Sequence, residues 1–168
     1  MQPENVSQES ATMRAAVQER YGGPEVITIR TVAKPVPGED EILVKVQAAS
    51  VNDFDWGLIS GTPYFIRLFL GLTRPKIRIA GCDIAGQVVA TGGAVSRWRA
   101  GDEVVGDLSG GRFGGFAEYV CCKEDQVVRK PPNLSFTDAA GIPQAALLAW
   151  EALLAGGGLV DGQRILIN

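Results

Sequence analysis

The chain has 168 residues, of which 46% are hydrophobic and 21% are charged, so it is long enough to bury one sizeable core. Its formal net charge is −3, from 16 basic and 19 acidic side chains. Because phosphate binding needs a basic surplus, no nucleic-acid partner is expected. No apolar stretch reaches membrane-spanning length and residues 1–12 are polar, so we predict a cytoplasmic protein with neither a signal peptide nor a membrane partner.

A polar tail over residues 1–12 is expected to be disordered, and short strands joined by turns follow it. The frequent glycines and prolines are typical of such strands, which favour a β-barrel. Strands are predicted at 13–18, 26–30, 41–49, 84–91, 102–106, 115–120 and 126–130, with the first two forming a hairpin and with Val44 and Val46 facing inward.

Helical signals fall in two places. Residues 53–56 could form a helical turn, and the apolar, aromatic residues 64–70 a short helix or a lid. Ser135 with Asp138 resembles a capping box, and Pro143 suits the first turn of a helix through 145–154 that ends at the glycines 156–158. Residues 164–167 read as a buried parallel strand.

Three cysteines and no histidine limit the chemistry of the chain. An odd count with Cys121 and Cys122 adjacent favours reduced, structural thiols over a disulfide framework. Zinc needs about four N, S or O ligands, and a nucleophilic cysteine needs a base that is usually histidine. We therefore expect Cys82 to be a buried thiol at a tight strand entry, and we expect no metal site.

Two further clusters of residues invite a functional interpretation. Residues 50–56 could present an amide and two carboxylates at the mouth of a barrel, or could simply form an Asx-capped helix start. Residues 110–115 are glycine-rich, but strand-like residues follow them, whereas a phosphate-binding loop leads into a helix.

Several motifs, in this order and spacing over residues 13–168, resemble those of the medium-chain dehydrogenase/reductases, and most of all the zinc-free quinone oxidoreductases. They are Met13-Arg14-Ala15-Ala16, Tyr21-Gly22-Gly23-Pro24, Ala49-Ser50-Val51-Asn52-Asp53-Phe54-Asp55-Trp56, Gly81-Cys82-Asp83-Ile84-Ala85-Gly86, Gly101-Asp102-Glu103-Val104 and Gly114-Gly115-Phe116-Ala117-Glu118-Tyr119.

The resemblance implies a mainly β fold with some helix. A GroES-like β-barrel catalytic domain would span residues 13–134. Residues 135–168 would add two short connecting helices and the orphan first strand of a Rossmann domain whose remainder, with the main NADPH site, is absent. The chain alone would then be inactive, and its exposed strand edges could pair in a homo-oligomer.

The resemblance also implies site residues. Asn52 would lie near the nicotinamide and the substrate, with Asp55 shaping the pocket and Tyr64 bounding it, and Tyr64 or Asn52 would stabilise charge on the substrate. Leu148 would contact the nicotinamide ring, where many relatives have a threonine. Zinc-dependent relatives carry ligands at positions matching Asn52, Cys82-Asp83 and Gln144, which make a poor zinc set.

The expected function is hydride transfer from NADPH to a quinone, an enone or a related carbonyl compound, without zinc. A stand-alone GroES-like interaction module with no enzymatic role is the alternative. A fragment of a zinc alcohol dehydrogenase is a third hypothesis, which would require stoichiometric zinc.

Overall fold

The computed structural model describes residues 11–155, 158 and 160–165. Most of the predicted tail (1–10), two of the glycines predicted to end the last helix (156 and 157) and the end of the last predicted strand (166–168) lie outside these residues. Of the strand predicted at 164–167, only residues 164 and 165 are described and neither is assigned to a strand, so the Rossmann strand stays a prediction.

The predicted hairpin is confirmed by β1 (Thr12–Gln18) and β2 (Ile27–Ala33), which pair antiparallel from Thr12 opposite Ala33 to Gln18 opposite Ile27. A 3₁₀ turn, η1 (Pro24–Val26), lies in the connection. Thr12 was predicted to belong to the disordered tail, but it already pairs with Ala33 and so is the first residue of β1.

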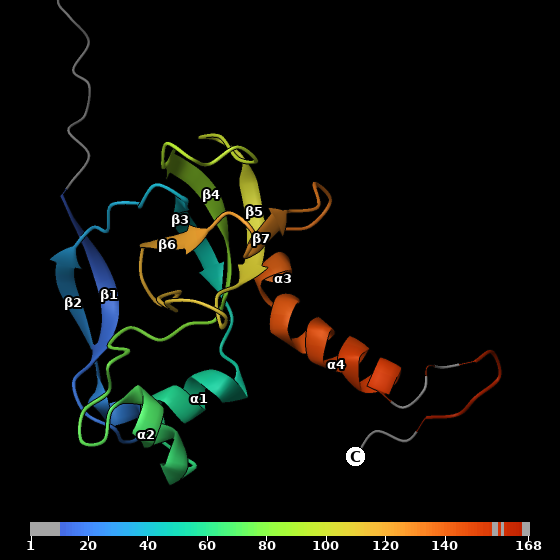
Figure 1. Ribbon diagram of the computed structural model, residues 1–168, viewed down its shortest axis with the longest axis horizontal. Coiled ribbons are helices and arrows are strands. Elements are labelled where there is room, and N and C mark those ends of the chain that lie inside the picture. Colours follow the sequence, from blue (N-terminus) through green and yellow to red (C-terminus); the bar gives the residue numbers. More distant parts are fainter. Residues whose placement is uncertain (1–10, 156–157, 159, 166–168) are drawn as a thin grey trace, which may run out of the picture.

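A second sheet contains β3 (Glu41–Ala49), β4 (Asp83–Thr91), β5 (Glu103–Asp107), β6 (Tyr119–Lys123) and β7 (Val127–Arg129). Its order is β6-β3-β4-β5-β7, and all four pairings are antiparallel. An isolated bridge between Ala15 and Ala117 links the two sheets. The mainly β fold class is therefore as expected, and the barrel wall is built from two sheets (Figure 1).

The strand predicted at 115–120 is displaced toward the C-terminus. Phe116 instead accepts a hydrogen bond from the Ala16 N–H of β1 (2.9 Å) and donates to the Ala80 carbonyl (3.0 Å). Pairing with β3 starts only at Tyr119, opposite Lys45. Residues 115–118 thus serve as the link between the sheets, a role that alternation along the chain does not reveal.

The main core lies against one face of the five-stranded sheet, and the helix α3 (Phe136–Ala140) covers the other face. Core members are Ile42, Val44, Ile84, Val88, Trp98, Val104, Leu108, Val120, Cys122 and Val127. On the opposite face, Ala85 and Val105 pack against Ala139 and Ala140 of α3. Because both faces of the first half of β4 are covered, Asp83, Ile84, Ala85 and Gly86 are all buried. Val44 is buried as predicted and Val46 partly so.

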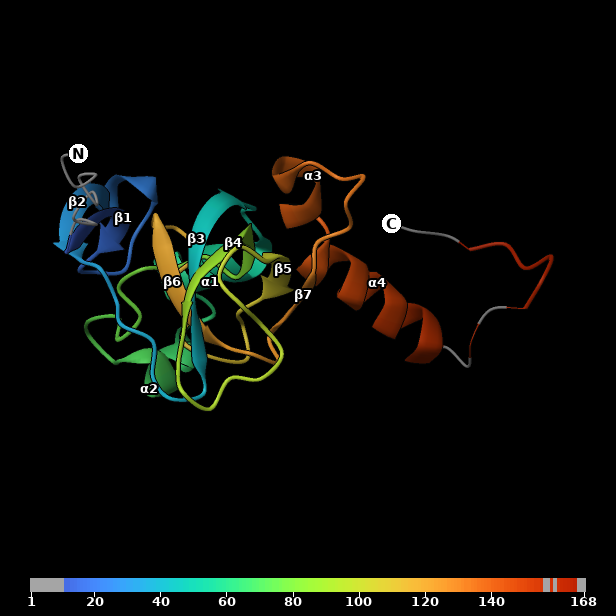
Figure 2. The ribbon, with the colours of Figure 1, turned by 90° about the horizontal axis from the view of Figure 1, so that it is seen from above.

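The remaining helices sit at two separate ends of the molecule. The helix α1 (Asp53–Ser60), the turn η2 (Tyr64–Ile66) and the helix α2 (Arg67–Leu70) lie below the hairpin, while α4 (Pro143–Ala155) projects from the side of β5 and β7 (Figures 1 and 2). None of the described helices is long and apolar enough to cross a lipid bilayer.

Candidate active site

Asn52 stands at the junction between β3 and α1, where it is the N-cap of the helix. Its backbone is extended, and its N–H donates to the Asp55 carboxylate at 2.9 Å. An acidic side chain three residues into a helix stabilises its start in this way. The helix ends at Gly61, whose left-handed backbone (φ 65°) suits glycine. The Asx-capped helix start is therefore present, and it places Asn52 at the end of a rigid element.

Asp55 is fully buried and clamps the start of α1 to the segment that enters β4. Its carboxylate accepts hydrogen bonds from the Asn52 N–H (2.9 Å), the Gly81 N–H (3.0 Å) and the Cys82 thiol (3.2 Å). Gly81 has a φ of 106°, and a side chain there would collide with the backbone of Gly115 and Phe116. Asp55 therefore does not face solvent, and its hydrogen bonds hold Asn52 and the Gly81–Cys82 segment in place.

Cys82 is a buried free thiol, as predicted for a cysteine at a tight strand entry. Burial, followed by the negative charge of Asp55, raises the pKa of this thiol far above its ordinary value. The thiol acts as a donor to Asp55, which leaves it neither a nucleophile nor a metal ligand.

Asp83, the next residue, is the centre of a second polar network. Its carboxylate accepts hydrogen bonds from the Ser50 hydroxyl (3.2 Å) and from the Asn52 amide nitrogen (3.1 Å). The backbone N–H of Gln144, in the first turn of α4, donates to both of its oxygens at 3.1 and 3.3 Å. A carboxylate at a helix N-terminus satisfies a free N–H group and complements the helix dipole. Asp83 thus ties α4 to the end of β3.

Burial raises the pKa of Asp83, and the hydrogen bonds from Gln144, Asn52 and Ser50 offset part of this shift. The side-chain nitrogen of Asn52 also donates to the Ser50 hydroxyl at 3.0 Å. Both hydrogens of this amide nitrogen are therefore committed inside the protein. The amide oxygen of Asn52 faces the backbone N–H of Asp55 in the capping box, and its second lone pair can accept a hydrogen bond from a ligand.

Tyr64 lies apart from these two networks, at the start of η2. Its side chain is 73% exposed, and the Arg67 guanidinium lies 4.8 Å from the centre of its ring. Within the described part of the chain, no hydrogen bond joins Tyr64 to Asn52 or Asp55. Its hydroxyl is therefore accessible to a ligand.

Leu148 lies on α4, one helical turn after Gln144, so the two residues share a face of that helix. Gln144 is bound to Asp83, which is bound to Asn52. The polar network therefore reaches α4 through a backbone N–H one helical turn before Leu148, which is 60% exposed. This face can contact a flat apolar ring, while Asn52 supplies a polar group at its end.

The donor set around Asn52 does not fit zinc. The sequence contains no histidine, and in the described residues no three Cys, Asp or Glu side chains gather as a ligand cluster. Asp83 is already engaged by Ser50, Asn52 and Gln144, and the thiol of Cys82 is kept protonated.

Ser50, Asp83 and Gln144 belong to the network around Asn52, but the sequence did not predict them as catalytic or cofactor-binding residues. Asp83 carried a weak signal, because a carboxylate in an apolar strand must find buried partners. The glycine-rich residues 110–115 lead into extended backbone, as expected. Cys121 and Cys122 are buried free thiols of β6.

Residues 38–132 match the alcohol dehydrogenase GroES-like domain family. The chain belongs to this family, within the medium-chain dehydrogenase/reductase superfamily.

Its relatives include a chloroplastic quinone-oxidoreductase homolog from Spinacia oleracea, 41% identical over 132 residues that cover 79% of this chain and 39% of the relative. An NADPH-dependent alkenal/one oxidoreductase of Arabidopsis thaliana is 35% identical over 149 residues, covering 84% and 37% of the two chains. A quinone oxidoreductase structure from Coxiella burnetii superposes with a TM-score of 0.78 and 31% identity, covering 87% and 45%. The chain thus spans less than half the length of these relatives.

Proposed function

We propose that this chain forms the substrate side of a nicotinamide-dependent oxidoreductase that reduces quinones, enones or related carbonyl compounds without zinc, with NADPH as the hydride donor. The observation that carries the proposal is the Ser50–Asn52–Asp83–Gln144 network. The family resemblance matches Asn52, Asp83 and Gln144 to positions of zinc ligands in zinc-dependent relatives, and in this chain hydrogen bonds join these three residues and Ser50. The relatives named for quinone and alkenal reduction support the substrate class.

In this proposal, each residue has a role set by its remaining hydrogen-bonding capacity. A bound nicotinamide supplies the hydride, and the protein supplies orientation and electrostatics. Leu148 offers apolar contact to the ring and the amide oxygen of Asn52 accepts a hydrogen bond from the cofactor side. Both N–H groups of the Asn52 side-chain amide already donate hydrogen bonds to Ser50 and Asp83. Tyr64 is therefore the donor to the substrate oxygen as negative charge develops on that oxygen. The guanidinium of Arg67 adds positive charge beside it.

The test uses the protein translated from the complete reading frame that contains this sequence. NADPH and NADH oxidation is measured with a para-quinone and with an α,β-unsaturated ketone, before and after chelation, together with the zinc content. We expect reduction that persists after chelation. Tyr64→Phe should lower kcat by about 10- to 100-fold, as loss of one oxyanion donor does, while Tyr119→Phe, a matched change on β6, leaves it unchanged.

Each alternative has its own outcome. Stoichiometric zinc and loss of activity on chelation would establish the zinc alcohol dehydrogenase hypothesis. A reading frame that lacks a nucleotide-binding segment, and a protein that does not bind NADPH, would favour the interaction module. The exposed apolar faces of α2 and α4 support this alternative. A cytoplasmic location and a homo-oligomer formed through the edge strands β6 and β7 are further expectations, checked by fractionation and by ultracentrifugation.

A further inference from the structure

Large apolar side chains cluster on the outside of η2 and α2 and the loop that follows. They are Phe65, Leu68, Phe69 and Leu72, and each is at least 64% exposed. We call this group the α2 patch. Single exposed apolar residues are ordinary, whereas a contiguous group marks a surface that binds something.

The α2 patch is held in place by polar contacts on its inner side. Arg67 donates to the carbonyls of Ser60 and Gly61, at 3.1 and 2.9 Å, and its guanidinium lies 4.5 Å from the centre of the Tyr21 ring. The Tyr21 hydroxyl donates to the Gly71 carbonyl at 2.8 Å. Because this anchoring directs the backbone, the apolar side chains are presented outward and cannot fold back onto the core.

Within the segment that carries the α2 patch, every charged residue is basic. Residues 56–82 contain four basic residues and no acidic one, although the whole chain carries a net charge of −3. The Lys76 N–H donates to the Leu70 carbonyl (2.7 Å) and its ammonium group to the Phe69 carbonyl (3.3 Å), so this charge lies at the end of α2. Arg74 is exposed in the same loop.

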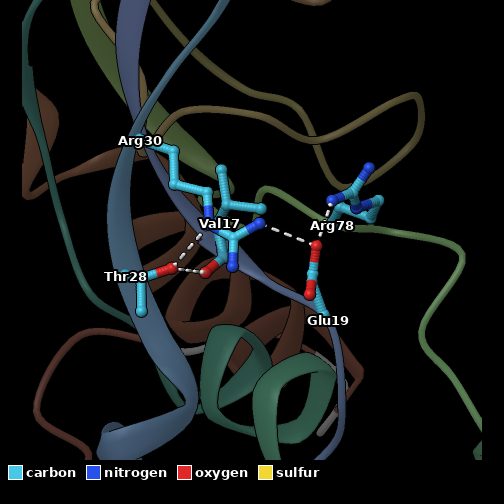
Figure 3. A network of polar contacts seen from close by, with 5 residues as sticks. All are labelled: Val17, Glu19, Thr28, Arg30 and Arg78. Carbon is cyan, nitrogen blue, oxygen red and sulfur yellow. Dashed lines mark hydrogen bonds and ion pairs between the residues drawn. The ribbon is translucent and has the colours of Figure 1, made fainter.

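The nearby acidic side chain Glu19 does not cancel this charge. It accepts hydrogen bonds from Arg30 at 2.7 Å and from Arg78 at 2.9 Å, and Figure 3 shows its carboxylate between the two guanidinium groups. One negative charge is therefore shared by two positive ones. The neighbourhood of Glu19 keeps a net positive charge.

The exposed face of α4 provides a contrast inside the same chain. Leu147, Leu148 and Leu154 are each more than half exposed, but residues 143–155 contain no basic residue and one acidic residue, Glu151. The two views agree that α2 and α4 lie at separate ends of the molecule (Figures 1 and 2). The α2 patch is thus distinct in both charge and position.

We infer that the α2 patch docks on the surface of a lipid bilayer that contains anionic lipids. Aromatic and aliphatic side chains insert at the headgroup boundary, and basic residues beside them are attracted to anionic headgroups. Such binding requires no spanning helix, so it revises only the expectation that the chain has no membrane partner. It also does not depend on the proposed enzymatic activity.

The test is co-sedimentation of the 168-residue chain with vesicles of phosphatidylcholine alone and with an equal mixture of phosphatidylcholine and phosphatidylglycerol. We expect binding to the mixed vesicles that weakens as salt is raised, and little binding to phosphatidylcholine. The double variant Arg74→Glu/Lys76→Glu should weaken binding by about 25-fold or more, since each basic residue contributes about fivefold. Phe65→Ser/Phe69→Ser should weaken it by at least about tenfold.

The matched control is Leu148→Ser/Leu154→Ser on α4, which should bind as the unmodified chain does. All of these side chains are exposed, so circular dichroism and the melting temperature should show intact folds. Equal binding to both vesicle types, or an equal loss in the α4 control, would overturn the inference in favour of general apolar adherence. If the chain does not bind vesicles and the patch variants change only its sedimentation coefficient, the membrane inference is overturned. The α2 patch would then bind a second copy of the chain.

Discussion

Asp55 and Asp83 are both fully buried carboxylates beside Cys82, but they accept hydrogen bonds from different parts of the chain. Asp55 accepts from two backbone N–H groups and a thiol, and it fixes the start of α1. Asp83 accepts from the Ser50 and Asn52 side chains and from the first turn of α4. The first carboxylate stabilises the frame, while the second assembles the residues that can face a ligand. Burial alone therefore does not identify a functional carboxylate.

The largest expected effect is the loss of Asp55. Asp55→Ala should lower the free energy of unfolding by about 3 to 4 kcal/mol, because buried backbone donors left without an acceptor cost about 1–3 kcal/mol each. Urea denaturation measures this change. Asp53→Ala, at an exposed acid of the same helical turn, should cost less than about 1 kcal/mol. Equal costs for the two variants would contradict the framework role of Asp55.

The replacement Asp83→Asn should cost less, about 1–2 kcal/mol near neutral pH, because an amide keeps one acceptor oxygen for the three donors. Burial raises the pKa of Asp83, so the folded chain holds this proton more tightly than the unfolded chain. The free energy of unfolding of the unmodified chain, relative to Asp83→Asn, should therefore fall as pH rises from 3.8 through the raised pKa and then level off.

Asp102→Asn provides the opposite pH response as a control. The backbone N–H of Arg99, together with the Arg129 side chain, lowers the pKa of Asp102. The stabilisation from this ionised carboxylate is present above its ordinary pKa and is lost as pH falls through the lowered pKa. Parallel pH profiles for the two variants in denaturant titrations would show that Asp83 is not held as described.

A smaller effect is expected for the two donors to Asp83. Asn52→Ala should cost about 1–2 kcal/mol, since it removes an N-cap and a donor, and Ser50→Ala about 1 kcal/mol. The double variant should cost less than the sum, because both groups bond to the same oxygen of Asp83 and to each other. Strict additivity in a double-mutant cycle would argue against a shared network.

The last prediction concerns the rate at which iodoacetamide alkylates the three cysteines, which should be low in the folded chain. Burial raises the pKa of Cys82, of Cys121 to about 11 and of Cys122 to about 12. Iodoacetamide should therefore modify the folded chain at least about 100-fold more slowly than the unfolded chain, since the thiolate is the reactive form. Mass spectrometry follows the rate for each cysteine. Fast labelling of Cys82 alone would mean that its bond to Asp55 does not form in solution.

Much of the fold could be predicted from the sequence. Alternating apolar residues and turn residues indicated β3 and the first hairpin, and Pro143 indicated the first turn of α4. The prediction failed at residues 115–118, which bridge the sheets through contacts with β1 and Ala80. Such contacts join residues distant in the chain, and alternation carries no information about them.

The same distinction holds for the candidate site. The sequence alone determined the cap of α1, because Asn52 and Asp55 are only three residues apart and a helix start brings them together. Only the tertiary structure decided that Asp83 joins Asn52 to Gln144, which lie 31 and 61 residues away from it. The physical reason is that a buried carboxylate must find donors wherever the packed chain supplies them.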